Sequence, residues 1–206
     1  MSWVDRERRT ARLVRVCYER CTSGGRRLTA EQLHALCRLT WLTKGEGGVA
    51  DNTRAVVAPA LSTILGVDLS STSLKELKAE LRAKGVGEDV RALASHPVGM
   101  VNYYAGFRGI AADWLRKHRD AVLNVVELVV RRDGRNAAAY DALDRLPPLP
   151  RAGAGDGKPS NLVTPLLACL DERGRAPIIN GERFGCFGDS DSRRRRCSNS
   201  TTGSLT

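Results

Sequence analysis

Signals for the start of a helix recur along this sequence. Ser2 is a plausible N-cap, and two capping boxes follow, in which Thr29 is paired with Gln32 and Ser73 with Glu76. Apolar residues spaced three and four apart come after these signals, and glycines come after the apolar stretches, where a left-handed residue commonly ends a helix. This pattern predicts an all-α fold, an irregular multi-helix bundle whose short helices are joined by glycine-containing turns.

The longest helical signal lies in the middle of the chain. No proline interrupts the stretch from Val98 to Arg132, and its apolar residues recur at helical spacing. Valine is β-branched and also suits a strand, but a continuous segment of this length favours a helix. We expect the buried face of this helix to comprise Val122, Val125, Val126, Val129 and Val130.

Three further helices have less distinct limits. The helix that begins after Thr29 is expected to run toward Leu42, and another is expected from Asn136 to Leu146. Residues 162–170 form an apolar helix candidate that Pro165 interrupts.

Composition divides the chain into four parts. We predict a helical domain over residues 1–146, an exposed Pro/Gly connector over 147–160, and a helix with a short extended segment, packed on the domain, over 161–181. Residues 182–206 are rich in Gly, Ser, Thr and Arg with little to bury, which predicts a disordered tail. A frameshift in a GC-rich gene would also produce this change, so the tail is either native or out of frame. Nothing after the extended segment is then expected to cover Ile178 and Ile179.

The charge balance favours a polyanionic partner. Lysine and arginine together number 33 against 23 acidic residues, which gives a net charge of +10. Most of the excess is arginine, whose planar side chain donates two parallel hydrogen bonds to phosphate. DNA or RNA is therefore the expected partner, and a GC-rich genome is the alternative explanation. No apolar run reaches the length of a membrane span, and the charged residues 1–12 lack the apolar segment of a secretory signal. We therefore expect a cytoplasmic protein without a membrane partner.

Basic residues of the first helix and of the loop after it form the candidate nucleic-acid-binding face. They lie outside the apolar stripe that contains Val14, Cys17 and Cys21. The alternative is a face that is merely solvated. The candidate residues are Arg6, Arg8, Arg9, Arg12, Arg15, Arg26 and Arg27, and the tail would add phosphate affinity through Arg193, Arg194, Arg195 and Arg196.

No constellation of residues predicts catalysis, a cofactor or a metal. Cys17, Cys21, His34 and Cys37 could converge on a zinc ion if the first two helices are antiparallel, but their spacing fits core packing better. The histidines have no neighbouring nucleophile with an orienting acid, and no glycine-rich phosphate-binding motif is present. The aromatic and basic residues of segment 103–108 could stack on unpaired bases, but their helical spacing favours a core stripe.

Four segments carry a resemblance to known proteins: NYYAGFRGIAADWLRKH at 102–118, PPLP at 147–150, NLVTPLLACLD at 161–171 and APIING at 176–181. Together they resemble the helical region of uncharacterised bacterial proteins that carry restriction-type or HNH-type nuclease modules. The resemblance implies a non-catalytic nucleic-acid-associated or scaffold module of a defence-related protein. The nuclease is then expected as a separate partner or a missing domain, and the resemblance transfers no catalytic residue. Truncation is expected from the change in composition of the tail. The alternatives are a helical protein-interaction module without a nucleic-acid role, or an enzyme whose site no motif reveals.

Overall fold

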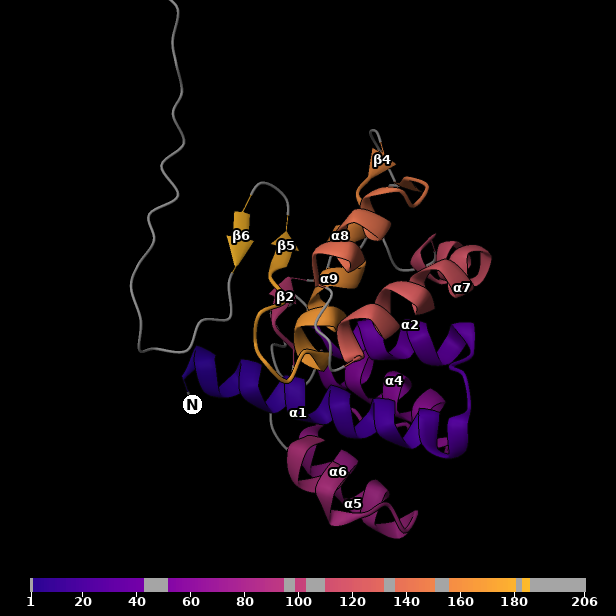
Figure 1. Cartoon of the computed structure of the whole chain (residues 1–206). Coiled ribbons are helices and arrows are strands. Elements are labelled where there is room, and N and C mark those ends of the chain that lie inside the picture. The colour runs from indigo at the N-terminus through magenta and orange to yellow at the C-terminus, as the bar shows by residue number, and fades with distance from the viewer. Residues whose placement is uncertain are drawn as a thin grey trace, which may run out of the picture.

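The computed structural model describes residues 2–42, 52–94, 99–102, 110–131, 136–150, 156–180 and 183–185. Helices dominate these residues, so the prediction of an all-α fold is confirmed (Figure 1). The α-helices are α1 (Trp3–Thr22), α2 (Ala30–Leu39), α4 (Ala58–Leu65), α5 (Leu74–Ala83), α6 (Glu88–Ala94), α7 (Ile110–Val130), α8 (Asn136–Asp144) and α9 (Pro159–Leu170). A 3-10 turn, η1 (Ser23–Gly25), follows α1, and a π-helical turn, η2 (Thr53–Val57), leads into α4.

Helices α1, α2 and α5 begin where the sequence predicts, whereas α7 begins at Ile110 and not near Val98. Ser2 Oγ accepts a hydrogen bond from the backbone N–H of Asp5 at 3.1 Å. At the start of α2, Thr29 Oγ1 accepts a hydrogen bond from the Gln32 N–H at 3.2 Å, and at the start of α5, Ser73 Oγ accepts one from the Glu76 N–H at 3.3 Å. In each box the side chain of the third helical residue bonds in return to the backbone N–H of the cap residue. Each box satisfies backbone N–H groups that have no partner within the helix, a contribution of about 1 kcal/mol per cap.

The core forms where α1, α2, α7 and α9 meet (Figure 1). Helix α9 is its most deeply buried part, since every residue of the helix except Asn161 is buried. The helix also continues through Pro165, which we expected to interrupt it. Proline removes one backbone hydrogen bond, but burial on all sides holds the backbone of α9 in place.

A pair of short strands lies where we predicted the end of one helix, near Leu42, and the beginning of another, after Val98. Helix α2 ends at Leu39, and β1 (Trp41–Leu42) pairs in parallel with β2 (Val101–Asn102), so the expectation of helix at both places is wrong. Gly99 makes the close approach possible, because its φ is +114° and a Cβ there would lie 2.5 Å from the Trp41 carbonyl oxygen. The buried Thr10 hydroxyl of α1 accepts a hydrogen bond from the Gly99 N–H at 2.8 Å.

The region predicted to be an exposed connector is partly packed. Strands β3 (Leu149–Pro150) and β4 (Asp156–Gly157) pair antiparallel, and Leu149 is fully buried. Trp114 Nε1 of α7 donates to the carbonyl oxygens of Pro147 at 3.2 Å and Pro148 at 3.1 Å. These contacts hold the start of the connector against α7.

The extended segment after α9 packs on that helix, and a paired strand that we did not expect follows it. Strand β5 (Ile178–Asn180) packs on α9, where Thr164 Oγ1 accepts a hydrogen bond from the Ile179 N–H at 2.9 Å, and Ile178 is buried. Strand β6 (Arg183–Gly185) pairs antiparallel with β5, so the predicted tail begins with a paired strand. The rest of that predicted tail lies outside the described residues.

Candidate nucleic-acid interface

Three of the predicted arginines line one groove between α1 and α6. Arg8, Arg9 and Arg12 face this groove, which has a volume of about 650 Å³ and which we call the α1–α6 groove. Helix α6 packs on α1, which lies between α6 and α9 in the view of Figure 1. Arg8 and Arg12 are one helical turn apart, so their side chains are neighbours on the exposed face of α1.

The acidic residues of the groove already have partners. Both carboxylate oxygens of Asp89 lie 3.0 Å from Arg20 Nη2, and Glu88 Oε2 lies 2.6 Å from Arg91 Nη2. The carboxylate of Asp5 accepts hydrogen bonds from the Ser2 hydroxyl and N–H, which lower the pKa of Asp5.

Two of the three arginines of the groove, unlike its acids, have no such partner. Neither Arg8 nor Arg12 forms an ion pair or a hydrogen bond with the residues that the structure describes, and both are exposed. Arg9 is half-buried and reaches the Ala92 carbonyl oxygen at 3.5 Å. The groove therefore presents two solvent-facing guanidinium groups to an anion.

Three other candidate arginines point elsewhere. Arg15 Nε donates to the carbonyl oxygen of Cys169 at 2.6 Å, near the C-terminal end of α9. Arg26 folds back on the end of α1, where it donates to the carbonyl oxygens of Arg20 and Ser23. Arg27 lies 3.8 Å from Asp120 and 3.9 Å from Glu127 of α7. These residues do not join Arg8 and Arg12 in one site.

Arg6 and the tail complete the candidate set. Arg6 is half-buried, and its Nε atom is enclosed by protein. Arg193 to Arg196 lie outside the described residues, as does the aromatic segment 103–108.

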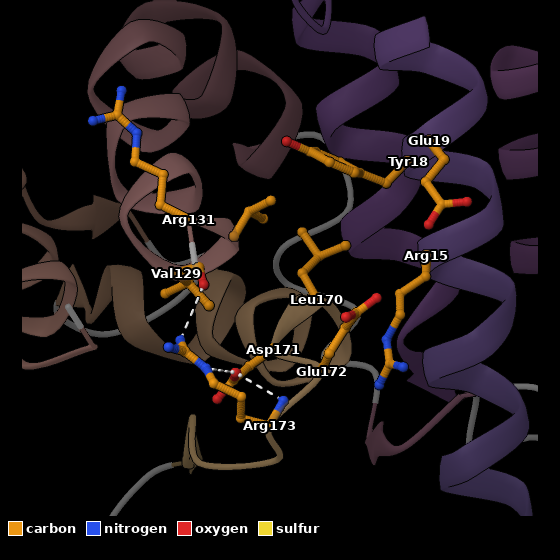
Figure 2. Close-up of a pocket in the computed structure, with 10 residues that line it drawn as sticks. Arg15, Tyr18, Glu19, Val129, Arg131, Leu170, Asp171, Glu172 and Arg173 are labelled. Carbon is orange, nitrogen blue, oxygen red and sulfur yellow. Dashed lines mark hydrogen bonds and ion pairs between the residues drawn. The ribbon is translucent and has the colours of Figure 1, made fainter. Parts of the chain in front are cut away.

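Arg15 borders a second cleft of about 600 Å³, on the side of α1 that faces the ends of α7 and α9. Figure 2 shows the Tyr18 ring and Arg15 on the α1 side of the cleft, with Leu170 and Glu172 at the end of α9. Val130 also lines the cleft and is 40% exposed, so its predicted burial is wrong. The last turn of α7 borders open space here instead of another helix.

No sequence motif marks Asp171, whose carboxylate accepts several hydrogen bonds at the edge of this cleft. Its carboxylate accepts hydrogen bonds from the backbone N–H groups of Arg175 and Ala176, both at 2.8 Å, and from Asn136 Nδ2 at 3.1 Å. Arg173 Nε adds a bond of 3.0 Å, and Arg173 Nη2 reaches the Val129 carbonyl oxygen at 3.3 Å (Figure 2). Asp171 thereby ties together the ends of α7, α8 and α9.

These hydrogen bonds set the ionisation of Asp171. Burial is the largest influence and would raise its pKa, but the bonds donated by Arg173, Arg175 and Asn136 together outweigh it and lower the pKa of Asp171 to about 2. The carboxylate is therefore charged at neutral pH and acts as a structural acceptor. An aspartate directly after an apolar helix was the only trace of this role in the sequence.

The predicted core thiols lie in the core. Cys17, Cys21 and Cys37 are buried, and burial raises the pKa of Cys17 and of Cys37 to about 12. The described residues contain no group of three or more His, Cys, Asp or Glu side chains arranged to hold a metal ion. Within the same residues, no helix combines the length and apolar character needed to cross a membrane.

Comparisons with known proteins return no match for this chain, whether with family models, with curated proteins or with solved structures. Its function therefore has to be argued from the chemistry of its own residues.

Proposed function

We propose that this chain is a non-catalytic nucleic-acid-binding module whose α1–α6 groove contacts the phosphate backbone. The observation that carries the proposal is the pair Arg8 and Arg12, exposed on adjacent turns of α1 beside acids that are already paired. Arg8 lies near enough to the Asp5 carboxylate to contribute to lowering its pKa, but neither Arg8 nor Arg12 forms an ion pair with the carboxylates that the structure describes. Both guanidinium groups are therefore available for a bidentate bond to phosphate.

The chemistry of the groove favours contact with the backbone over contact with bases. The described residues that line it include no aromatic ring and no side-chain amide, the groups that stack on bases or read adenine. Arginine beside aliphatic and acidic residues fits sequence-independent phosphate contact. A cytoplasmic location is part of this proposal.

The proposal is tested by titrating duplex DNA at about 50 and about 200 mM salt, where released counterions make affinity fall with salt. Two or three phosphate contacts predict a slope of about −2 to −3 in log affinity against log salt. Arg8→Glu combined with Arg12→Glu should abolish measurable binding.

Arg145→Glu combined with Lys158→Glu is the matched control, because both residues are exposed, lie outside the groove and give the same change in net charge. Equal loss in the two double variants would show that only overall charge matters. A wild-type chain that does not bind at low salt would refute the proposal and favour a protein-interaction module.

The resemblance over residues 102–181 supports a second part of the proposal, that the module works beside a nuclease of a bacterial defence system. The chain alone is then expected to cut no DNA or RNA with magnesium or manganese present. Cleavage that survives repurification of the chain would overturn the non-catalytic assignment.

A further inference from the structure

The cleft between α1 and the ends of α7 and α9, which we call the α7–α9 cleft, has an apolar wall. Figure 2 shows the Tyr18 ring on the α1 side and Leu170 at the end of α9, and Val130 of α7 also lines the cleft. Val130 is 40% exposed, so apolar surface here is open to a ligand. The volume of about 600 Å³ lies within the range of about 300 to 1,000 Å³ that is typical of small-molecule sites.

Two carboxylates at the cleft have no partner within the described part of the chain. Glu19 belongs to α1 and Glu172 follows the end of α9, and both side chains line the cleft and are exposed. Neither forms an ion pair or a hydrogen bond with a described residue. The third acid of the cleft, Asp171, is already bound by Arg173 and Asn136. Glu19 and Glu172 are therefore the carboxylates available to an external cation.

Most of the positive groups at the cleft are paired with acids. Arg173 Nε donates to Asp171 at 3.0 Å, and Arg131 Nη2 lies 3.7 Å from Glu127 Oε2 of its own helix. The Arg131 guanidinium also points away from the α1 side of the cleft (Figure 2). Apart from these pairs, the lining charges are the two free carboxylates and Arg15, an excess of one negative charge on a chain whose net charge is +10.

The ends of two helices add to this negative character. Helices α7 and α9 both end at the cleft, and the C-terminal end of a helix carries a partial negative charge of about half an elementary charge. Two arginines already respond to it: Arg173 Nη2 donates to the Val129 carbonyl oxygen in α7, and Arg15 Nε donates to that of Cys169 in α9. A further cation that enters the cleft meets the same helix ends.

We propose that the α7–α9 cleft binds a small organic cation, an amine or guanidine attached to an apolar body. The charged head lies between Glu19 and Glu172, and the body covers Val130 and the Tyr18 ring, whose face also attracts a cation. An inorganic cation would leave the apolar wall uncovered, and an organic anion would face two carboxylates. The cleft shares no lining residue with the α1–α6 groove, so this proposal is independent of the proposed function.

Three probes with the same apolar body test the preference for a positive head. Phenylbutylamine carries a charged amine at neutral pH, phenylbutanol is neutral and phenylbutyrate is an anion. Each is titrated into the full chain, and binding is followed by NMR chemical shifts. The amine should bind about tenfold more tightly than the alcohol, because a hydrogen bond to a carboxylate is stronger when its donor is charged. Phenylbutyrate should bind more weakly than either.

Variants then separate the contribution of the head from that of the body. Glu19→Gln combined with Glu172→Gln should lower the affinity for the amine to that of the alcohol and leave the alcohol unchanged. Both residues are exposed, so the core is not disturbed. Val130→Ser should weaken the amine and the alcohol alike, by about threefold to fivefold, because both lose the same apolar contact.

The control is Asp141→Asn combined with Asp144→Asn, which removes two negative charges from exposed positions of α8 outside the cleft. It should change the affinity for the amine by less than about twofold, since salt screens distant charges. NOEs from the bound amine to the Tyr18 ring and the Val130 methyl groups should place the probe. Equal affinity of amine and alcohol, tighter binding of phenylbutyrate, equal loss in the two double variants, NOEs elsewhere only, or no binding at millimolar amine would each overturn the proposal.

Discussion

Replacing Asp171 with asparagine tests whether one buried carboxylate joins three helix ends. The side chain is 1% exposed, and donors from the start of α8 and from residues 173–176 surround both of its oxygens. Asparagine has nearly the same shape but places an NH₂ group where one oxygen was. That NH₂ would face N–H donors, so hydrogen bonds would be lost and a repulsive contact would replace them.

The shift in pKa gives the size of the effect. The pKa of Asp171 falls from 3.8 to about 2 on folding, and 1.36 kcal/mol per unit converts this to about 2 kcal/mol of stability at neutral pH. The folded pKa is the lower one, so this contribution is present above pH 4 and is lost as the pH falls toward 2. About half should remain at pH 3. Adding the mismatched donor, we expect Asp171→Asn to lower the free energy of unfolding by about 2 to 4 kcal/mol at pH 7.

Urea unfolding of the wild-type chain and the variant, followed by circular dichroism from pH 7 to pH 3, measures this difference directly. The gap between the two proteins should narrow toward low pH, because the protonated aspartic acid comes to resemble asparagine. Asp141→Asn is the control, since Asp141 is exposed on α8 and the substitution makes the same change in charge. It should change stability by less than about 0.5 kcal/mol at each pH. A gap at Asp171 that is below 0.5 kcal/mol, or independent of pH, would refute the reasoning.

Two further predictions concern the core. Gly99→Ala should lower the free energy of unfolding in urea by about 2 kcal/mol or more, because the new Cβ combines strain at a positive φ with a clash against the Trp41 carbonyl oxygen. Gly85 also has a positive φ but has open space around it, so Gly85→Ala should lower the free energy of unfolding by only about 1 kcal/mol. In a Cys186→Ser, Cys197→Ser background, Cys17 and Cys37 should not react with a disulfide reagent at pH 8 until the chain unfolds, because burial raises the pKa of both thiols to about 12. Rapid labelling of the native chain would contradict the buried positions of these thiols.

The parts of the fold that were predictable from the sequence depend on neighbours in the chain. A capping box needs only residues three apart, and all three predicted starts, at Ser2, Thr29 and Ser73, form. The pairing of β1 with β2 depends instead on segments about sixty residues apart, joined through Gly99. Local spacing carries no information about such a partner, so the helix was extended too far. Pro165 shows the reverse case, in which burial overrides a local helix-breaking signal.

In the candidate site, too, features that depend on local sequence were predictable and contacts between distant segments were not. Exposure of Arg8 and Arg12 follows from the apolar stripe of α1, because residues opposite a buried stripe face solvent. The hydrogen bond of Arg15 could not be predicted in this way, because its partner, the carbonyl oxygen of Cys169, lies 154 residues away in sequence. The Asp171 network was equally hidden, because its donors come from separate segments that meet only in the fold.

The arginines of α1 therefore fall into two groups, those bound to acceptor groups of the protein and those left for an external anion. The C-terminal end of α9 has carbonyl oxygens without helical partners, and Arg15 is bound there. The acids of α6 are already paired with Arg20 and Arg91, so Arg8 and Arg12 remain for an external anion. Counting charges from the sequence gives seven contact residues in the first helix and the loop after it, and the structure leaves two or three. The salt dependence of DNA binding distinguishes these counts. A slope of about −2 to −3 in log affinity against log salt supports binding at the α1–α6 groove. A slope near −6 would mean that all seven arginines bind phosphate, and that Arg15, Arg26 and Arg27 lose their contacts within the protein when DNA binds.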